Sequence, residues 1–148
     1  MMLHPRESPG FLLWHATLRW QRDISQALGP LDLTHVQFVL LARTWWLNRQ
    51  GQHPSQIALA EFAGTDVKMT SQVVRSLEHK GLVEREVDEA DTRARRLRVT
   101  RRGGRLAPRA IGLVQQVDAA FFDGVPSADV LHLLRRLARF PEPEAARQ

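Results

Sequence analysis

Residues 56–80 predict two helices separated by a tight turn. The first is short, over 56–63, and the Gly-Thr-Asp sequence at 64–66 both interrupts it and offers a cap for the next helix. The second, over 67–80, is followed by Gly81, which suits the left-handed conformation that commonly ends a helix. This part of the chain therefore predicts a helix-turn-helix unit.

The second of these helices has two distinct faces. Its apolar face is predicted to contain Met69, Val73, Val74 and Leu77. Its other face is polar and carries Lys68, Ser71, Gln72, Arg75 and His79. Such a helix packs on one side and leaves donors and acceptors on the other.

A β-hairpin is predicted after the second helix. Stretches 82–87 and 96–100 have the two-residue period of strands, and a polar loop over 88–94 separates them. The order of helix, turn, helix and basic hairpin favours a winged helix-turn-helix fold. The fold class predicted is thus mainly α with a small β-hairpin wing.

Long amphipathic helices flank this unit on both sides. One is predicted over 11–28; another follows a capping box formed by Thr34 and Gln37. After the hairpin, Thr100 is placed to cap a helix that runs to Gly124, and a last helix starts at Pro126-Ser127. At 148 residues the chain is predicted to form a single domain over 1–148.

Positive charge is concentrated in one segment. Eight arginines fall between positions 93 and 109, no acidic residue lies between Asp91 and Asp118, and without those eight the net charge would be −3 rather than +5. A local basic patch on an otherwise mildly acidic chain suggests docking to a polyanion, the alternative being a solvated arginine-rich face. Arg101, Arg102 and Arg105 start a helix, where cations oppose the helix dipole; this indicates a phosphate-facing use or an acidic partner.

Double-stranded DNA is the polyanion that this order of elements fits. The helix over 67–80 suits the major groove, and an arginine at the hairpin tip suits the narrow minor groove. The candidate DNA-binding residues are Lys68, Thr70, Ser71, Gln72, Arg75, Arg93, Arg95 and Arg96. For Thr70, packing at the turn is an equal alternative to a phosphate contact.

The sequence from Met69 to Arg85 resembles the recognition helix and first wing strand of MarR-type transcriptional regulators. Asp91-Thr92-Arg93 and Val99-Thr100-Arg101-Arg102-Gly103 are similar to the tip and the closing motif of that family's wing. The resemblance implies a DNA-binding lobe over 33–100 and a homodimer held by interlocking helices, 11–28 and 101–140. It also implies a palindromic operator and a repressor that a small-molecule effector releases.

Small aromatic anions often bind in this family between the dimerisation helices and the DNA-binding lobe. The resemblance therefore makes Trp14, His15 and Trp45 candidates for contacts with a small aromatic or anionic effector. Packing in the core or at the dimer interface is the alternative for these large side chains, since aromatics at helical spacing usually pack.

Several other functions lack support in the sequence. Without cysteine there is no disulfide, zinc-thiolate site or thiol redox switch, and the histidines show no metal-ligand spacing. No nucleotide loop or catalytic motif is present, so we expect no enzyme activity, no cofactor and no metal. No apolar run is long enough for a membrane span and no signal peptide is evident, which favours a cytoplasmic protein.

Two rival functions remain compatible with the same elements. A winged-helix protein-interaction module would use the basic face on an acidic protein. A non-specific nucleic-acid-binding protein would ignore sequence, but it would usually interleave aromatic residues with the basic ones, and residues 88–109 contain none.

Overall fold

The computed structural model describes residue 2 and residues 4–87, 90 and 95–140 of the chain. It confirms a mainly helical fold with one two-stranded antiparallel hairpin. The helices are α1 (Pro9–Leu28), α2 (His35–Arg49), α3 (Gln56–Ala63), α4 (Val67–His79), α5 (Arg101–Phe121) and α6 (Ser127–Ala138). The strands are β1 (Val83–Val87) and β2 (Arg95–Val99), and short 3₁₀ turns lie at η1 (Pro5–Glu7) and η2 (Gly29–Leu31).

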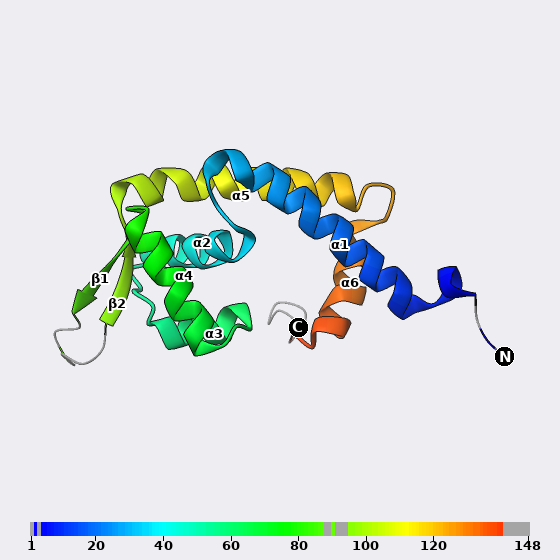
Figure 1. Ribbon diagram of the computed structural model, residues 1–148, viewed down its shortest axis with the longest axis horizontal. Coiled ribbons are helices and arrows are strands. Elements are labelled where there is room, and N and C mark those ends of the chain that lie inside the picture. The colour runs from blue at the N-terminus through cyan, green and yellow to red at the C-terminus, as the bar shows by residue number, and fades with distance from the viewer. Residues whose placement is uncertain (1, 3, 88–89, 91–94, 141–148) are drawn as a thin grey trace, which may run out of the picture.

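The elements form two groups joined by one long helix (Figure 1). Helices α2, α3 and α4 gather with the hairpin at one end, and this group is called the lobe below. Helices α1 and α6 lie toward the other end, and α5 runs across the top of the molecule from the hairpin to that end. The arrangement separates a compact lobe from an extended pair of terminal helices.

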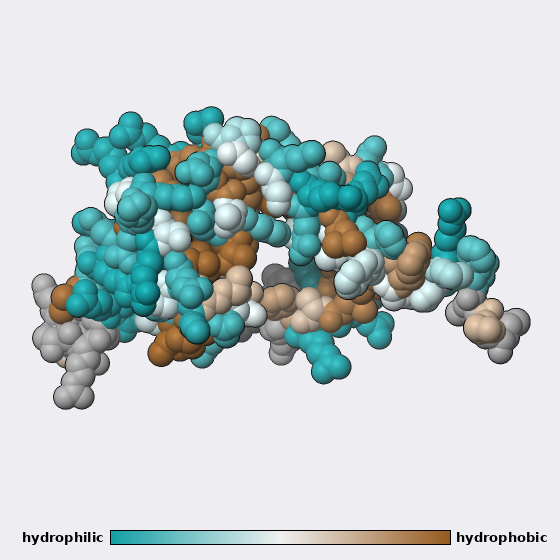
Figure 2. Space-filling view, in the orientation of Figure 1, coloured by the Kyte–Doolittle hydropathy of each residue, from teal (hydrophilic) through white to brown (hydrophobic). Residues whose placement is uncertain are grey.

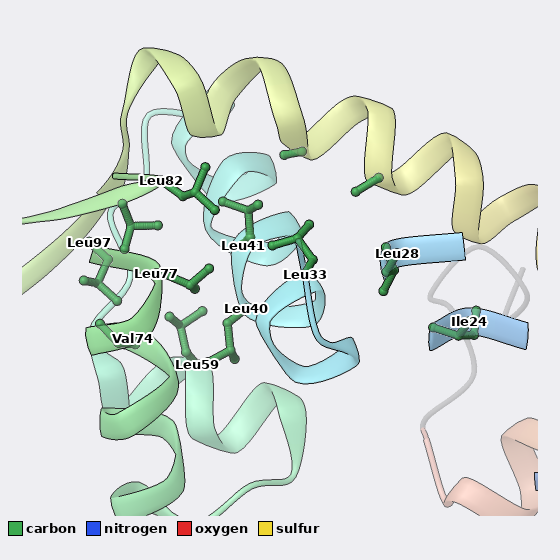
Figure 3. Packing of buried hydrophobic residues seen from close by; sticks show 13 residues of the cluster. Ile24, Leu28, Leu33, Leu40, Leu41, Leu59, Val74, Leu77, Leu82 and Leu97 are labelled. Carbon is green, nitrogen blue, oxygen red and sulfur yellow. The ribbon is translucent and has the colours of Figure 1, made fainter. Parts of the chain in front are cut away.

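The hydrophobic core lies inside the lobe and continues to the end of α1. Leucines of α2 meet side chains of α3, α4 and both strands of the hairpin there (Figure 3). Its fully buried side chains include Ile24, Leu28, Leu40, Leu41, Leu59, Val74, Leu77, Leu82 and Leu97. Because α4 contributes two of them, its opposite face is held toward solvent.

Helix ends follow the predicted caps closely. The Thr34 hydroxyl accepts from the Gln37 backbone N–H at 3.2 Å and the Gln37 side chain accepts from the Thr34 N–H at 3.1 Å, so the predicted capping box is present. Gly81 has φ +71°, as predicted. Strand β2, predicted over 96–100, spans Arg95–Val99. Thr100 lies outside the strand because its hydroxyl accepts from the Gly103 N–H and caps α5.

The buried face of α4 differs from the predicted one. Met69, expected on the apolar face, is 38% exposed, whereas Thr70 is fully buried. The inner stripe is Thr70, Val74 and Leu77, with Val73 partly buried beside it. A threonine occupies the first turn of that stripe because its hydroxyl finds hydrogen-bond partners at the α3–α4 turn.

The hairpin is anchored to the lobe by one side chain at the end of α2. Asn48 Nδ2 donates to the carbonyls of Gln52 (3.0 Å) and Leu97 (3.2 Å), and Asn48 Oδ1 accepts from the Val99 N–H (2.8 Å). The Leu97 N–H also donates to the Pro54 carbonyl at 2.9 Å. These bonds occupy the free edge of β2 and set the angle at which the hairpin leaves the lobe.

We expect Asn48→Ala to lower the free energy of unfolding by about 1–3 kcal/mol, because it leaves part-buried backbone groups of β2 without partners. Urea unfolding followed by circular dichroism measures this. Gln50→Ala is the control, since it removes a nearby exposed amide. Equal stability of the two variants would contradict the anchoring role of Asn48.

Candidate DNA-binding surface

The turn between α3 and α4 fixes the start of α4. Gly64 ends α3 with φ +69°, a conformation that glycine adopts without strain. Two residues on, the Asp66 carboxylate accepts from the Met69 N–H at 2.7 Å and caps α4. The short turn therefore presents the first turns of α4 at the surface of the lobe.

The exposed side of α4 carries the predicted polar residues. Lys68, Gln72 and Arg75 are exposed, and Ser71 is half-buried beside them. Their spacing places them on one helical face, opposite the inner stripe. In the described part of the chain, neither Lys68 nor Arg75 is ion-paired with a carboxylate. Two cations and two hydrogen-bonding side chains thus share one open face.

Thr70 does not belong to this face. Its side chain is fully buried, and its hydroxyl lies 2.9 Å from the Asp66 carbonyl and 2.8 Å from the Thr65 hydroxyl. The packing alternative therefore holds for Thr70. Its hydroxyl secures the turn that positions the α4 face.

The hairpin carries two of the three predicted wing arginines within the described residues. Arg95 is exposed and pairs in register with Val87; Arg96 is half-buried and pairs with Glu86. Both lie at the end of β2 nearest the tip. Arg93 falls outside the described residues, so its assignment rests on the sequence.

The stem of the hairpin is less basic than the count of arginines suggests. Arg98 is ion-paired with Glu84 and, at 2.9 Å, with Glu86, which also lies 3.3 Å from His53. The hydrogen bond that Arg98 donates to Glu84, followed by the negative charges of Glu84 and Glu86, raises the pKa of Arg98. Sequence analysis missed these pairs, although the alternation of Glu84 and Glu86 on β1 was the available signal. Among the described residues, Arg95 is the exposed arginine at the end of β2 nearest the tip, and the charge of Arg98 is compensated by β1.

The three candidate effector residues lie on α1 and α2 and differ in their surroundings. Trp14 is 65% exposed on α1, and His15, also exposed, packs against the Phe11 ring in a tilted arrangement with ring centroids 4.4 Å apart. Trp45 packs against the core from α2. None of the three lines the apolar cavity of about 810 Å³ between α1, α5 and α6.

That cavity ends at a polar cluster that the sequence did not predict. Trp20 Nε1 donates to Asp118 Oδ1 at 2.8 Å, and the Trp20 ring meets the His35 ring edge-on at 5.0 Å. Burial lowers the pKa of His35, and the charge of Asp118 opposes that shift. The cluster joins α1, α2 and α5 where the lobe meets the terminal helices.

Other kinds of site are not supported by the described residues. No helix among them is long and apolar enough to cross a bilayer. No group of three histidine, aspartate or glutamate side chains among them converges as a metal site.

The helix pair α3–α4, the polar outer face of α4 and the anchored hairpin together define a winged helix-turn-helix protein. Residues 33–94 match the model of the MarR family. Over 118 residues, or 80% of each chain, the sequence is 46% identical to the uncharacterized HTH-type transcriptional regulator YdcH of Bacillus subtilis (strain 168). The chain belongs to the MarR family of transcriptional regulators.

Two solved structures share this fold along nearly the whole chain. CouR of Rhodococcus jostii RHA1, solved with p-coumaroyl-CoA bound, is 25% identical and superposes with a TM-score of 0.81 over 97% of this chain and 100% of its own. BpsR of Bordetella bronchiseptica is 24% identical, with a TM-score of 0.80 over 95% and 100% of the two chains. Its structure concerns the regulation of DNA binding by 6-hydroxynicotinic acid.

Proposed function

We propose that this regulator is a homodimeric repressor that binds a palindromic operator and leaves it when a small-molecule effector binds. The observation that carries the proposal is the open polar face of α4 beside a hairpin that carries the exposed Arg95 at the end of β2 nearest its tip. The major groove admits a helix with this face, and the hairpin extends the contact along the duplex.

The residues of the surface fall into three groups by proposed role. Gln72 and Arg75 suit base edges, because an amide matches adenine and a guanidinium matches guanine. Lys68 and Ser71 suit phosphate oxygens near the start of α4. Arg95 and Arg96, with Arg93 at the tip, are proposed to contact the backbone or the minor groove beyond the major-groove contact.

The homodimer is proposed from the exposed apolar side chains of α1 and α6. No residue of α6 is buried. Hydrophobic surface gathers where the two helices lie (Figure 2). The residues involved are Phe11, Leu12, Leu13, Trp14, Leu18, Leu131, Leu133, Leu134 and Leu137, together with Phe140 just beyond α6, each at least 38% exposed. A second chain that interlocks its own helices here would bury them, and two α4 helices would then meet two half-sites.

An effector is proposed from CouR and BpsR, whose structures concern p-coumaroyl-CoA and 6-hydroxynicotinic acid. A small aromatic or anionic compound remains the proposed class. The exposure of Trp14 and His15 favours the dimer interface over an effector pocket for these two residues. For such a DNA-bound regulator we propose action in the cytoplasm, without a catalytic step or a cofactor.

Selection of bound sequences from a random duplex pool, at two salt concentrations, tests the proposal. We expect a palindrome with half-sites about 10 base pairs apart, one turn of the duplex. Recovery of no motif, with binding that collapses at higher salt, would favour non-specific electrostatic binding. Absence of DNA binding at either salt concentration would favour a protein-interaction module.

Arg75→Ala is expected to weaken operator binding by about 1–3 kcal/mol and to relax base preference at one position of each half-site. Lys68→Ala should weaken operator and random DNA alike, because a phosphate contact carries no sequence information. Fluorescence anisotropy with both duplexes measures the difference. Arg22→Ala, an exposed arginine of α1, is the control for net charge. An operator affinity of Arg75→Ala equal to that of Arg22→Ala would exclude base reading by Arg75.

A further inference from the structure

A second basic site lies on α5, separate from the outer face of α4. A groove of about 550 Å³ is lined by Pro30, Leu31, Arg102, Arg105, Leu106 and Arg109. Its walls are the 3₁₀ turn η2, between α1 and α2, and the first half of α5. No proposed DNA contact lines it.

The groove concentrates positive charge that the described residues do not neutralise. Its lining includes three arginines and no acidic residue. None of the three is ion-paired with a carboxylate in the described part of the chain. Asp32, next to η2, is engaged instead by Lys80, whose Nζ lies 3.5 Å from its carboxylate.

Without a bound anion, the placement of these arginines is electrostatically unfavourable. Arg105 and Arg109 are one helical turn apart, and like charges at that spacing repel each other. Arg102 lies in the first turn of α5, where the helix dipole disfavours a cation. A bound anion would offset both effects.

One of the guanidinium groups is already oriented. Arg102 Nη1 donates to the Lys80 carbonyl at 2.9 Å. The Lys80 ammonium in turn donates to the Asp32 carbonyl (2.5 Å) and the Gln37 side chain (2.9 Å). Arg102 is therefore tied to the end of α4, which reduces the ordering that an anion would have to impose on it.

We propose that this groove binds a small anion with two or more linked phosphate groups. Guanidinium groups pair with phosphate through two parallel hydrogen bonds, and three of them match a ligand with several phosphates better than a single carboxylate. The apolar side chains of Pro30, Leu31 and Leu106 leave a surface for an uncharged part of the ligand. The site is distinct from the proposed operator surface and does not depend on it.

Isothermal titration of the full chain with tripolyphosphate, in Mg²⁺-free buffer at physiological ionic strength, tests the site. We expect saturable binding of one ligand per chain. Arg105→Ala and Arg109→Ala should each weaken it about tenfold or more, as expected for a charged hydrogen bond. Arg101→Ala is the matched control, because it removes the same charge from the same helix at an exposed position outside the groove.

Three results would overturn the proposal. One is absence of saturable binding, and another is equal weakening by Arg101→Ala and Arg109→Ala, which would indicate diffuse attraction to the arginine-rich segment. The third is loss of random-duplex affinity in Arg109→Ala with tripolyphosphate binding unchanged, which would assign the groove to DNA phosphates. Failure of the operator selection would leave the expected titration result unaffected.

Discussion

Gly103→Ala is expected to destabilise the protein by about 3 kcal/mol or more, a large part of the 5–15 kcal/mol that holds a typical domain together. A Cβ at position 103 would lie 2.0 Å from the Leu82 carbonyl oxygen and 2.9 Å from its carbonyl carbon. Both are backbone atoms, so no side chain can move aside. The same oxygen accepts the Thr100 N–H at 3.0 Å, and relieving the clash would strain that bond.

Gly104→Ala is the matched control for this prediction. Its Cβ would meet nothing closer than the Val99 side chain, at 3.9 Å. Alanine also favours a helix over glycine, so Gly104→Ala should be neutral or stabilise by up to about 1 kcal/mol. Thermal and urea unfolding compare the two variants. Wild-type stability in Gly103→Ala would refute the close approach of α5 to the Leu82 backbone.

Leu133→Glu combined with Leu137→Glu is expected to give a folded monomer whose operator affinity is about 100-fold lower or worse. The two leucines lie one helical turn apart on α6, are 56% and 60% exposed, and do not line the cavity beneath α6. Four-residue spacing places both carboxylates on the surface proposed to meet the second chain. A dimer engages its second half-site as an intramolecular step, and this advantage, of order 10² to 10⁴, is lost in a monomer.

Sedimentation velocity measures the mass of the variant against the 16.9 kDa of one chain, and anisotropy measures its operator affinity. Circular dichroism should show unchanged helix content, because both positions are exposed in the single chain. Leu133→Met with Leu137→Met preserves apolar volume and should remain dimeric. A monomeric variant that still binds the operator like wild type would contradict recognition by a dimer.

Local signals predicted most of the fold. The bounds 56–63 of α3 match the structure, because a serine cap and a glycine in the left-handed conformation mark its two ends. The capping box at Thr34 and the cap at Thr100 were likewise predicted from side chains that satisfy backbone groups within a few residues. Interactions of this range are encoded in contiguous sequence.

Contacts between distant residues were not predictable in the same way. Helical periodicity suggested Met69 for the buried face of α4, but the available hydrogen-bond partners at the α3–α4 turn favour Thr70. Asn48 gave no signal of its own, since its partners on β2 lie about fifty residues away. The neutralisation of Arg98 depends on the strand register, which charge counting ignores. For the surface itself, sequence identified Lys68, Ser71, Gln72 and Arg75 on one face, and the structure agrees with that grouping.

Thr100 has a mechanical consequence for this architecture. Its N–H donates to the Leu82 carbonyl, its hydroxyl donates to the Gly81 carbonyl at 2.6 Å, and the same hydroxyl accepts from the Gly103 N–H. One residue therefore bonds the end of α4, the base of the hairpin and the first turn of α5. These hydrogen bonds hold the three elements at fixed angles to one another. If α5 tilted, α4 and the hairpin would therefore move with it as one rigid unit. In the proposed dimer, the distance between the two lobes would then change. The position of α4 relative to the hairpin within each lobe would stay the same.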